Sequence, residues 1–298
     1  MMPAERKIAV SVLLPTKDEG VNLYKCLDAL SPALNVYVLD SHSTDDTIPI
    51  AEKFGAHVVQ FDYKGGYPKK RQWAMDNLPV DTQWILLVDA DEVISKALWH
   101  EIDQVLRYPD PCSAYILVKS FHFLGSAFKY GGFSFGAITL FQKGKAHFET
   151  IIDDDINGLD MEVHERILVN GRVGKLKNPI IHQDFKNLEA YIARHNKYST
   201  WEAKLRYQYL KTGKYGDQTV RRNLFGNTQE RRRFLKTIAI RTPFEPLGWF
   251  LYHYILRLGF LEGRPGLIAC LIRALYIIQV RAKIYELSLS SHHADKIF

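Results

Sequence analysis

Three clusters of polar residues each follow a short apolar run in the first third of the chain: Pro15–Glu19, Asp40–Thr47 and Asp89–Glu92. Ligands bind at the carboxyl ends of strands in open α/β sheets, so these clusters are the first candidates for a binding site. Asp89 and Asp91 form an Asp-x-Asp triplet, which can direct one carboxylate toward a nucleotide and the other toward a divalent cation. Hard oxygen ligands and bound phosphates suit Mg²⁺ or Mn²⁺. The alternative is a plain acidic turn.

The run Asp40–Thr47 holds four hydroxyl and three carboxyl groups. A carboxylate here can accept a hydrogen bond from a pyrimidine N–H, and the hydroxyls can meet a ribose. The alternative is that some of these residues form a turn and cap the next helix. The sequence contains no GxxxxGK[ST] loop and no GxGxxG fingerprint, so it does not support a P-loop ATPase or a Rossmann-type dinucleotide enzyme.

Basic residues and a histidine supply further candidates. Lys69, Lys70 and Arg71 follow a Gly-Gly-Tyr-Pro turn, where glycines allow close approach and cations can meet phosphate. A solvated helix start is the alternative, but helix N-termini favour acids over bases, which supports a ligand. His182 ends an apolar run and is a candidate metal or diphosphate ligand, although a single histidine can also be structural.

The elements that must position these residues are predicted from apolar periodicity. Short β-branched or apolar runs alternate with helix-period stretches in the first half, which predicts an α/β fold with a mixed, mostly parallel sheet covered by helices. Strands are expected at Ile8–Leu14, Val36–Leu39, His57–Phe61 and Trp84–Val88. Helices are expected over 22–30, over 45–54 with Thr44 or Asp45 as the cap, and from residue 69. Residues 113–182 read as short strands and turns, and the chain beyond Asn187 as helical.

Bulk composition narrows the cellular context. The chain has 298 residues, a net charge of +6 and three widely spaced cysteines without a CxxC pair, which favours a reducing compartment. The first apolar run is too short for a secretory signal, so we expect the protein to remain in the cytosol. Residues 186–241 hold 14 Lys and Arg against 4 Asp and Glu, a local excess of +10. The positive charge is therefore concentrated in the C-terminal part.

Two apolar stretches close the chain, Pro246–Leu261 and Gly266–Val280, and arginines interrupt both. Neither gives the 18 apolar residues that a spanning helix needs. Their composition predicts helices that lie in a membrane interface beside anionic lipid. A buried helical hairpin or a dimer seam is the alternative.

In order and spacing, the three polar clusters resemble the motifs of the inverting family 2 glycosyltransferases, which have the GT-A fold. Pro15, Thr16 and Glu19 lie in the part that looks like the family's opening motif, in which Asp18 departs from the commoner asparagine. Asp40, Ser41, Ser43 and Asp45 lie in the part that looks like its nucleotide motif. Asp89-Ala90-Asp91-Glu92 looks like its metal motif.

Looser matches resemble a narrower branch, the lipopolysaccharide-core glycosyltransferases of Gram-negative bacteria. They are Val163-His164-Glu165-Arg166, Ile181-His182, segments of the helix around 198–203, and the glycines from Gly259 to Gly266. The resemblance implies a catalytic domain over 1–185 and a basic, amphipathic helical region over 186–298, attached peripherally to the cytoplasmic side of the inner membrane.

The resemblance also implies a mechanism. An acceptor hydroxyl of a glycolipid or oligosaccharide attacks the anomeric carbon, and the nucleoside diphosphate of a nucleotide sugar, expected to be a UDP-sugar, leaves. Mn²⁺ or Mg²⁺ held by Asp91, with His182 as a further ligand, would neutralise the diphosphate. Glu165 is the candidate general base, with Glu162 in reserve. A surface glutamate paired with Arg166 or Arg172 is the other interpretation of Glu165.

Three other functions compete with this one. A sugar nucleotidyltransferase would need a glycine-rich basic loop in its first strand–helix turn, and Thr16–Gly20 is not one. A non-catalytic, membrane-associated nucleotide-sugar binding protein would not require the acidic residues Asp89, Asp91 and Glu165. A nucleic-acid binder would explain the basic segment, but no zinc finger or RNA-binding motif accompanies it, so we expect no nucleic-acid partner.

Overall fold

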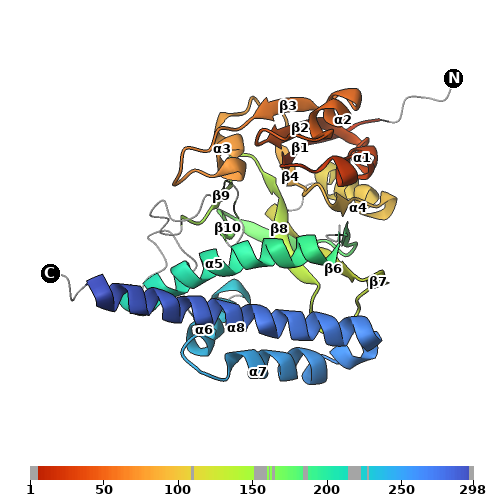
Figure 1. Cartoon of the computed structure of the whole chain (residues 1–298). Coiled ribbons are helices and arrows are strands. Elements are labelled where there is room, and N and C mark those ends of the chain that lie inside the picture. The colour runs from red at the N-terminus through yellow and green to blue at the C-terminus, as the bar shows by residue number, and fades with distance from the viewer. Residues whose placement is uncertain are drawn as a thin grey trace. The chain divides into compact units, whose positions relative to one another are not determined.

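The structure is a computed structural model that describes residues 6–108, 111–150, 160, 162, 165–183, 187–213, 223–226 and 228–294. The chain forms two compact units, which are described separately. The first unit comprises Met1–His122, Ser134–Phe148 and Gly158–Asp184. The second comprises Phe123–Phe133, Glu149–Asn157 and Phe185–Phe298. Figure 1 shows the elements of both, coloured along the chain.

The first unit contains the sheet. Its first half runs β1 (Ile8–Thr16), α1 (Gly20–Ala29), β2 (Ala33–Asp40), α2 (Thr47–Lys53), β3 (His57–Gln60), α3 (Lys70–Asn77), β4 (Trp84–Leu87), β5 (Glu92–Val93) and α4 (Lys96–Arg107). Its second half contributes β6 (Cys112–Phe123), β8 (Phe135–Gln142), β9 (Ala146–Phe148), β10 (Ile167–Val169), β11 (Arg172–Lys175) and β12 (Ile180–His182). The strands and helices predicted for the first half are therefore confirmed to within a few residues at their ends.

The strand order is β3-β2-β1-β4-β8-β6-β12-β5, and β11 adds to β6. The neighbouring pairs β3–β2, β2–β1 and β1–β4 are parallel, whereas β8 is antiparallel to both of its neighbours, β4 and β6. β12 runs parallel to β6 and antiparallel to β5. β9 and β10 form a separate two-stranded ladder. The predicted mixed, largely parallel sheet is confirmed.

Alternate residues of the central strands enter two hydrophobic cores. Val10, Val12 and Leu14 of β1 lie in a core that also holds buried residues of α1 and α4, while Leu13 lies in a second core that holds Ala74 of α3. A strand that is covered on both faces reads as a continuous apolar run, which is why Ile8–Leu14 is so uniformly apolar. Helices packed on both faces hold the sheet firmly in place.

The second unit is helical, as the sequence predicts for the C-terminal part. It contains β7 (Ser126–Ala127), α5 (Leu188–Thr212), α6 (Thr228–Ala239), α7 (Glu245–Leu251), the π-helical turn η1 (Tyr252–Leu256), the 3-10 turn η2 (Gly259–Glu262) and α8 (Gly263–Ala294). Helix α5 is capped at its start by Asn187, whose side chain accepts a hydrogen bond from the Ala190 amide, and at its end by Gly213, whose φ is 70°. Left-handed glycine is a common helix stop.

A buried ionic cluster connects the helices of the second unit. Glu202 of α5 accepts hydrogen bonds from Arg206 (2.9 Å) and from the Tyr276 hydroxyl of α8 (2.6 Å), and its Oε1 lies 2.9 Å from Lys236 Nζ of α6. Arg206 also donates to both oxygens of Glu245 in α7, each at 2.9 Å. Because every charge has an opposite partner, the cluster fixes how the four helices pack.

Candidate active site

The three polar clusters lie at one edge of the sheet because β1, β2 and β4 are parallel neighbours. Thr16 is the register partner of Asp40, and Leu13 is the partner of Leu87. Asp89 therefore follows the end of β4 beside the ends of β1 and β2. Pro15, one of the predicted donor-site residues, is a buried residue of β1, paired with Leu39.

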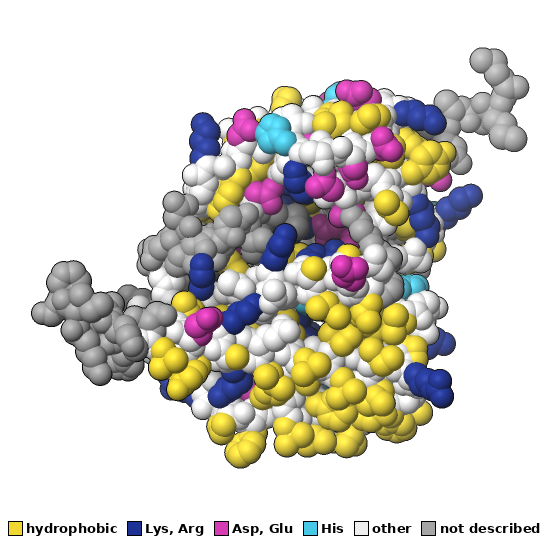
Figure 2. Space-filling view, viewed as in Figure 1, with side chains coloured by type: hydrophobic (Ala, Val, Ile, Leu, Met, Phe, Trp, Pro, Cys, Tyr) yellow, Lys and Arg dark blue, Asp and Glu magenta, His cyan; other side chains and the backbone are white. Residues whose placement is uncertain are grey.

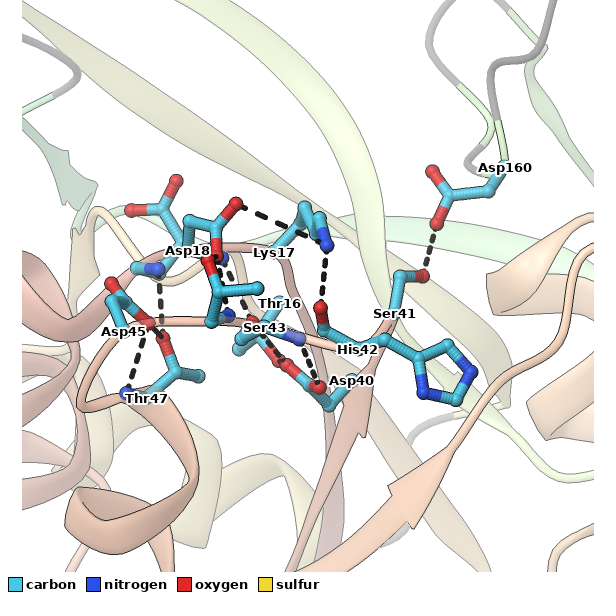
Figure 3. A network of polar contacts seen from close by, with 12 residues as sticks. Thr16, Lys17, Asp18, Asp40, Ser41, His42, Ser43, Asp45, Thr47 and Asp160 are labelled. Atoms are coloured by element: carbon cyan, nitrogen blue, oxygen red, sulfur yellow. Dashed lines mark hydrogen bonds and ion pairs between the residues drawn. The ribbon is translucent and has the colours of Figure 1, made fainter.

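Asp40 is fully buried and lies at the centre of the network in Figure 3. Its carboxylate accepts hydrogen bonds from the Thr16 hydroxyl (3.0 Å), the Ser43 amide (2.8 Å) and the Gln60 side chain (3.1 Å). Burial opposes the charged form, but the hydrogen bonds from Ser43, Thr16 and Gln60 outweigh it and lower the pKa of Asp40. The carboxylate thus holds the ends of β1 and β2 together.

Asp45 and Glu19 connect the starts of two helices. Asp45 accepts from the Gly20 amide at the start of α1 (2.9 Å) and from the Thr47 amide at the start of α2 (3.0 Å). The Glu19 amide donates to the Thr47 hydroxyl (2.8 Å), and its carboxylate accepts from Asn22 (2.9 Å). The N-cap residue of α2 is Asp46, so the predicted cap at Thr44 or Asp45 is wrong. Asp45 instead binds one amide at the start of each helix, where the positive end of the helix suits its charge.

Ser41 and Lys70 meet at Asp160, which the sequence analysis did not single out. The Ser41 hydroxyl donates to Asp160, and Lys70 Nζ lies 2.9 Å from the same carboxylate. Lys70 also donates to the Thr16 carbonyl (3.0 Å). Burial lowers the pKa of Lys70, against the attraction of Asp160. Lys70 therefore lies at the predicted edge of the sheet, and it pairs with Asp160 of the same chain.

Asp89 lies between two cations. Arg71 pairs with Asp89 Oδ1, and Lys119 Nζ of β6 lies 2.8 Å from Oδ2. Lys119 also pairs with the buried Glu92, whose carboxylate accepts from the Asp89 amide (2.9 Å). Burial disfavours charge here, but Arg71 and Lys119 lower the pKa of Asp89 well below its usual range, and Asp89 and Glu92 raise the pKa of Lys119.

Asp91 and His182, the predicted metal ligands, are brought together. His182 Nδ1 lies 3.4 Å from Asp91 Oδ1 and 3.4 Å from Glu92 Oε1, because β12 pairs with β5 so that His182 is opposite Glu92. Burial opposes protonation, but Glu92 and Asp91 raise the pKa of His182 to about 9. The negative potential that favours a proton here would equally favour a cation.

A carboxylate and an imidazole are ligands that Mn²⁺ accepts, and donor phosphates could complete its coordination. Among the described residues, no group of three or more His, Cys, Asp or Glu side chains is arranged to hold a metal by itself. Asp91 and His182 therefore suit a cation whose remaining ligands come from a bound substrate.

Glu162 is bound to the start of α3. Its carboxylate accepts from the amides of Arg71 (3.0 Å) and Gln72 (2.9 Å), and its side chain is buried. Burial raises the pKa of Glu162, against the attraction of Arg71. Acceptance from helix amides is the geometry of a cap, so Glu162 fixes the segment that carries Glu165 onto α3.

Glu165 forms a buried ion pair with Lys69, with 2.7 Å between Lys69 Nζ and Glu165 Oε1. The side chains are 3% and 5% exposed, so the alternative of a solvated surface glutamate is wrong. Val163 and His164, which carry part of the same motif, lie outside the described residues. Lys69 and Glu165 are both candidate site residues by sequence, but their contact cannot be deduced from a separation of 96 residues.

Lys119 is the main residue that sequence reasoning missed. It lies within the largely apolar strand β6, and a single lysine in such a strand is a signal because a buried lysine needs an acidic partner. Asp160 gave no such signal, since it belongs to an acidic segment with no clear periodicity.

Comparison with known proteins shows which family the first part of the chain resembles. Residues 11–123 match the family model described as glycosyl transferase family 2. This part of the chain is therefore similar to family 2 glycosyltransferases. The chain is 25% identical over 286 residues to the lipopolysaccharide core biosynthesis glycosyltransferase LpsC of Rhizobium meliloti, covering 94% of this chain and 93% of that protein. It is also 27% identical over 293 residues to an uncharacterized glycosyltransferase of Rickettsia conorii, covering 95% and 92%.

The solved structures that match this one include two glycosyl-transferring enzymes with bound Mn²⁺. The mannosyltransferase PcManGT from Pyrobaculum calidifontis, in complex with GDP-Man and Mn²⁺, has 14% identity and a TM-score of 0.49 over 94% of this chain and 87% of that one. Glucosyl-3-phosphoglycerate synthase from Mycobacterium tuberculosis, in complex with Mn²⁺ and UDP, has 24% identity and a TM-score of 0.31 over 39% of this chain and 44% of that one.

Proposed function

We propose that this glycosyltransferase moves a sugar, with inversion, from a nucleotide-sugar donor to a glycolipid or lipopolysaccharide-type acceptor. The observation that supports this most is the convergence of Asp89, Asp91 and His182 at the carboxyl edge of parallel strands, where open α/β sheets bind nucleotides. The 25% identity to a lipopolysaccharide core glycosyltransferase over almost the whole chain supports the acceptor class.

The donor is expected to be a UDP-sugar, bound over the ends of β1, β2 and β4. Asp40, Ser43 and Asp45 hold this edge rigid through hydrogen bonds to neighbouring groups, which leaves the backbone of the edge to face a nucleoside. The Ser41 hydroxyl already donates to Asp160. Arg71 and Lys119 fix Asp89 from two sides. A carboxylate held so firmly can orient a ligand at little entropic cost.

Asp91 and His182 would hold a divalent cation. A bound Mn²⁺ or Mg²⁺ would act as a Lewis acid on the departing diphosphate. The chain's own contribution is to position the two side chains, which are 15% and 17% exposed, against the buried Glu92. Glu92 in turn is fixed by Lys119.

Glu165 remains our candidate for the general base. A base must be held within reach of the acceptor hydroxyl, and the ion pair with Lys69 at 2.7 Å fixes the position of the Glu165 carboxylate. Glu162 is the weaker candidate because both of its carboxylate oxygens already accept from amides of α3.

We further assign residues 1–185 to catalysis and residues 186–298 to peripheral attachment at the cytoplasmic side of the inner membrane. The excess of +10 over residues 186–241 and the exposed apolar residues of α7 and α8 support this assignment. Among the helices of the described residues, none is long and apolar enough to cross a bilayer.

The test is a donor screen with the full-length protein. UDP-, GDP- and dTDP-sugars are each incubated with Mn²⁺ or Mg²⁺, with and without a lipid-linked oligosaccharide acceptor, and nucleoside diphosphate release is measured. One donor class should be consumed, faster with the acceptor, and proton NMR should show an inverted anomeric configuration in the product. Binding of a nucleotide sugar without turnover would favour the non-catalytic binding protein, and pyrophosphate chemistry would favour a nucleotidyltransferase.

A further inference from the structure

Exposed apolar side chains are concentrated in one segment of the second unit. Of the 32 large hydrophobic residues that are exposed among the described residues, 14 lie between 244 and 278. They include Leu247 (55% exposed), Ile255 (50%), Leu256 (73%), Leu261 (53%) and Leu275 (54%). Figure 2 shows apolar side chains gathered over α7 and the adjoining end of α8. A continuous apolar patch of this kind needs a partner surface.

Helix α8 is apolar on two faces. Tyr276, Ile277 and Val280 are buried in a core with Ala203 of α5. Leu267, Leu271 and Leu275 are spaced four residues apart, so they form a stripe along the helix, and all three are exposed. A helix that is apolar all round is normally covered all round. Packing within the second unit buries the face that carries Tyr276, Ile277 and Val280, while the stripe of Leu267, Leu271 and Leu275 stays exposed.

The turn between η1 and α8 presents the apolar residues at its tip. Leu256, Leu258, Phe260 and Leu261 are between 42% and 73% exposed. Arg257 and Arg264, both exposed, flank this tip in the sequence. Cations bordering an apolar tip are suited to anionic headgroups above a hydrocarbon layer.

The tip is held in place by the segment before β8. Glu262 Oε1 accepts hydrogen bonds from the amides of Lys129 (2.7 Å) and Tyr130 (2.6 Å). The Gly131 amide donates to the Arg257 carbonyl (2.8 Å), and its carbonyl lies 2.6 Å from His253 Nδ1. The apolar residues are therefore displayed by a turn that is fixed at both ends.

We propose that α7, η1, η2 and the first half of α8, the membrane face, insert into the interfacial layer of a bilayer that contains anionic lipids. This inference rests on the membrane attachment in the proposed function, and it is independent of the transfer chemistry. It assigns the attachment to the arginine-flanked tip and the exposed stripe of α8.

Charge favours a bilayer over a second copy of the chain. Within the membrane face, residues 245–278, the charged residues are three arginines and two acids. Glu245 pairs with Arg206 and Glu262 accepts hydrogen bonds from backbone amides, whereas Arg257 and Arg264 are exposed. Two such faces would bring like charges together, whereas anionic headgroups would neutralise them.

The test is sedimentation of the full-length protein with vesicles of phosphatidylcholine, alone or with 30% phosphatidylglycerol. The face variant Leu256→Asp/Leu261→Asp should bind the mixed vesicles at least tenfold more weakly. The control Leu34→Asp/Tyr108→Asp makes the same change at two exposed apolar residues of the first unit, and it should bind within about twofold of wild type. Arg257→Gln/Arg264→Gln should lose most of the preference for the anionic lipid.

Equal vesicle binding by the face variant and the wild type would overturn the proposal. A second result would also overturn the proposal. If the wild type does not bind vesicles but forms a dimer without lipid, and the face variant is monomeric, then the membrane face is covered by a second copy of the chain. Transfer to a detergent-dispersed short-chain acceptor should be unchanged in the face variant. If that transfer is absent in the wild type while vesicle binding persists, the proposed function fails and the membrane face stands.

Discussion

Lys119 Nζ lies 2.8 Å from Asp89 Oδ2, although 30 residues separate them in the chain. Lys119 comes from β6 and Asp89 follows β4, with β8 between these two strands in the sheet. Lys119 also pairs with Glu92, so a single ammonium group neutralises two of the three acids in the Asp89–Glu92 motif. The third acid, Asp91, faces His182 instead.

Replacing Lys119 with methionine should destabilise the protein, because it removes the partner of the buried Glu92 carboxylate. Breaking a buried ion pair by removing one partner costs about 3–5 kcal/mol. The free energy of unfolding from urea titration measures the effect. Lys96→Met, on the exposed start of α4, is the matched control and should change stability by no more than about 0.5 kcal/mol. If both variants were equally stable, Lys119 would not have this neutralising role.

Glu165→Gln tests the general base. Transfer should fall by at least about a hundredfold while donor and metal binding persist, because a base touches the acceptor hydroxyl and not the diphosphate. The variant also leaves Lys69 buried beside a neutral amide, so stability must be measured alongside the transfer rate.

A double variant separates the two effects. Lys69→Met/Glu165→Gln should regain part of the lost stability, since neither charge is left without its partner, but it should not regain transfer. Transfer within a few-fold of wild type in Glu165→Gln would move the search to Glu162. Loss of donor binding in a folded Glu165→Gln variant would make Glu165 a donor-site or structural residue.

Asp40 should contribute to acid sensitivity. Its pKa is lower in the folded protein than in the unfolded chain, so its stabilising contribution is present above the unfolded value of about 3.9 and is lost as the pH falls below it. Asp40→Asn should therefore be less stable at pH 7 and should show a shallower loss of stability between about pH 4 and pH 2. Unfolding free energies at both ends of that range measure this, and an unchanged slope would contradict it.

The sheet was predictable because its central strands are buried on both faces and are therefore uniformly apolar, as Ile8–Leu14 illustrates. The edge of the sheet that carries the candidate site could be predicted in the same way, since Asp40 and Asp89 come directly after uniformly apolar strands. The hydrogen-bond partners of these residues could not be predicted from the sequence, because the residues of a run such as Asp40–Thr47 can bind either a ligand or the neighbouring backbone. In the structure Asp40 and Asp45 bind neighbouring hydroxyl and amide groups.

Contacts that depend on strand order were also beyond the sequence. Lys119 reaches Asp89 across β8, which lies between β4 and β6 in the sheet, and His182 reaches Asp91 because β12 pairs with the two-residue strand β5. Neither pairing has a periodicity signal, since β5 and β12 have only two and three residues. The Lys69–Glu165 pair joins residues 96 positions apart and is equally non-local.

The rate of nucleoside diphosphate release from the best donor shows whether a cation held by Asp91 assists departure of the diphosphate. The rate is compared in Mn²⁺, in excess EDTA, and in Mn²⁺ with Asp91→Asn. An amide cannot supply the anionic ligand that a hard cation prefers, so we predict that excess EDTA and Asp91→Asn each abolish release. Added Mn²⁺ should restore release by the wild type but not by the variant. The variant should still unfold as one cooperative unit. Full activity of folded Asp91→Asn, or of the wild type in EDTA, would contradict the account.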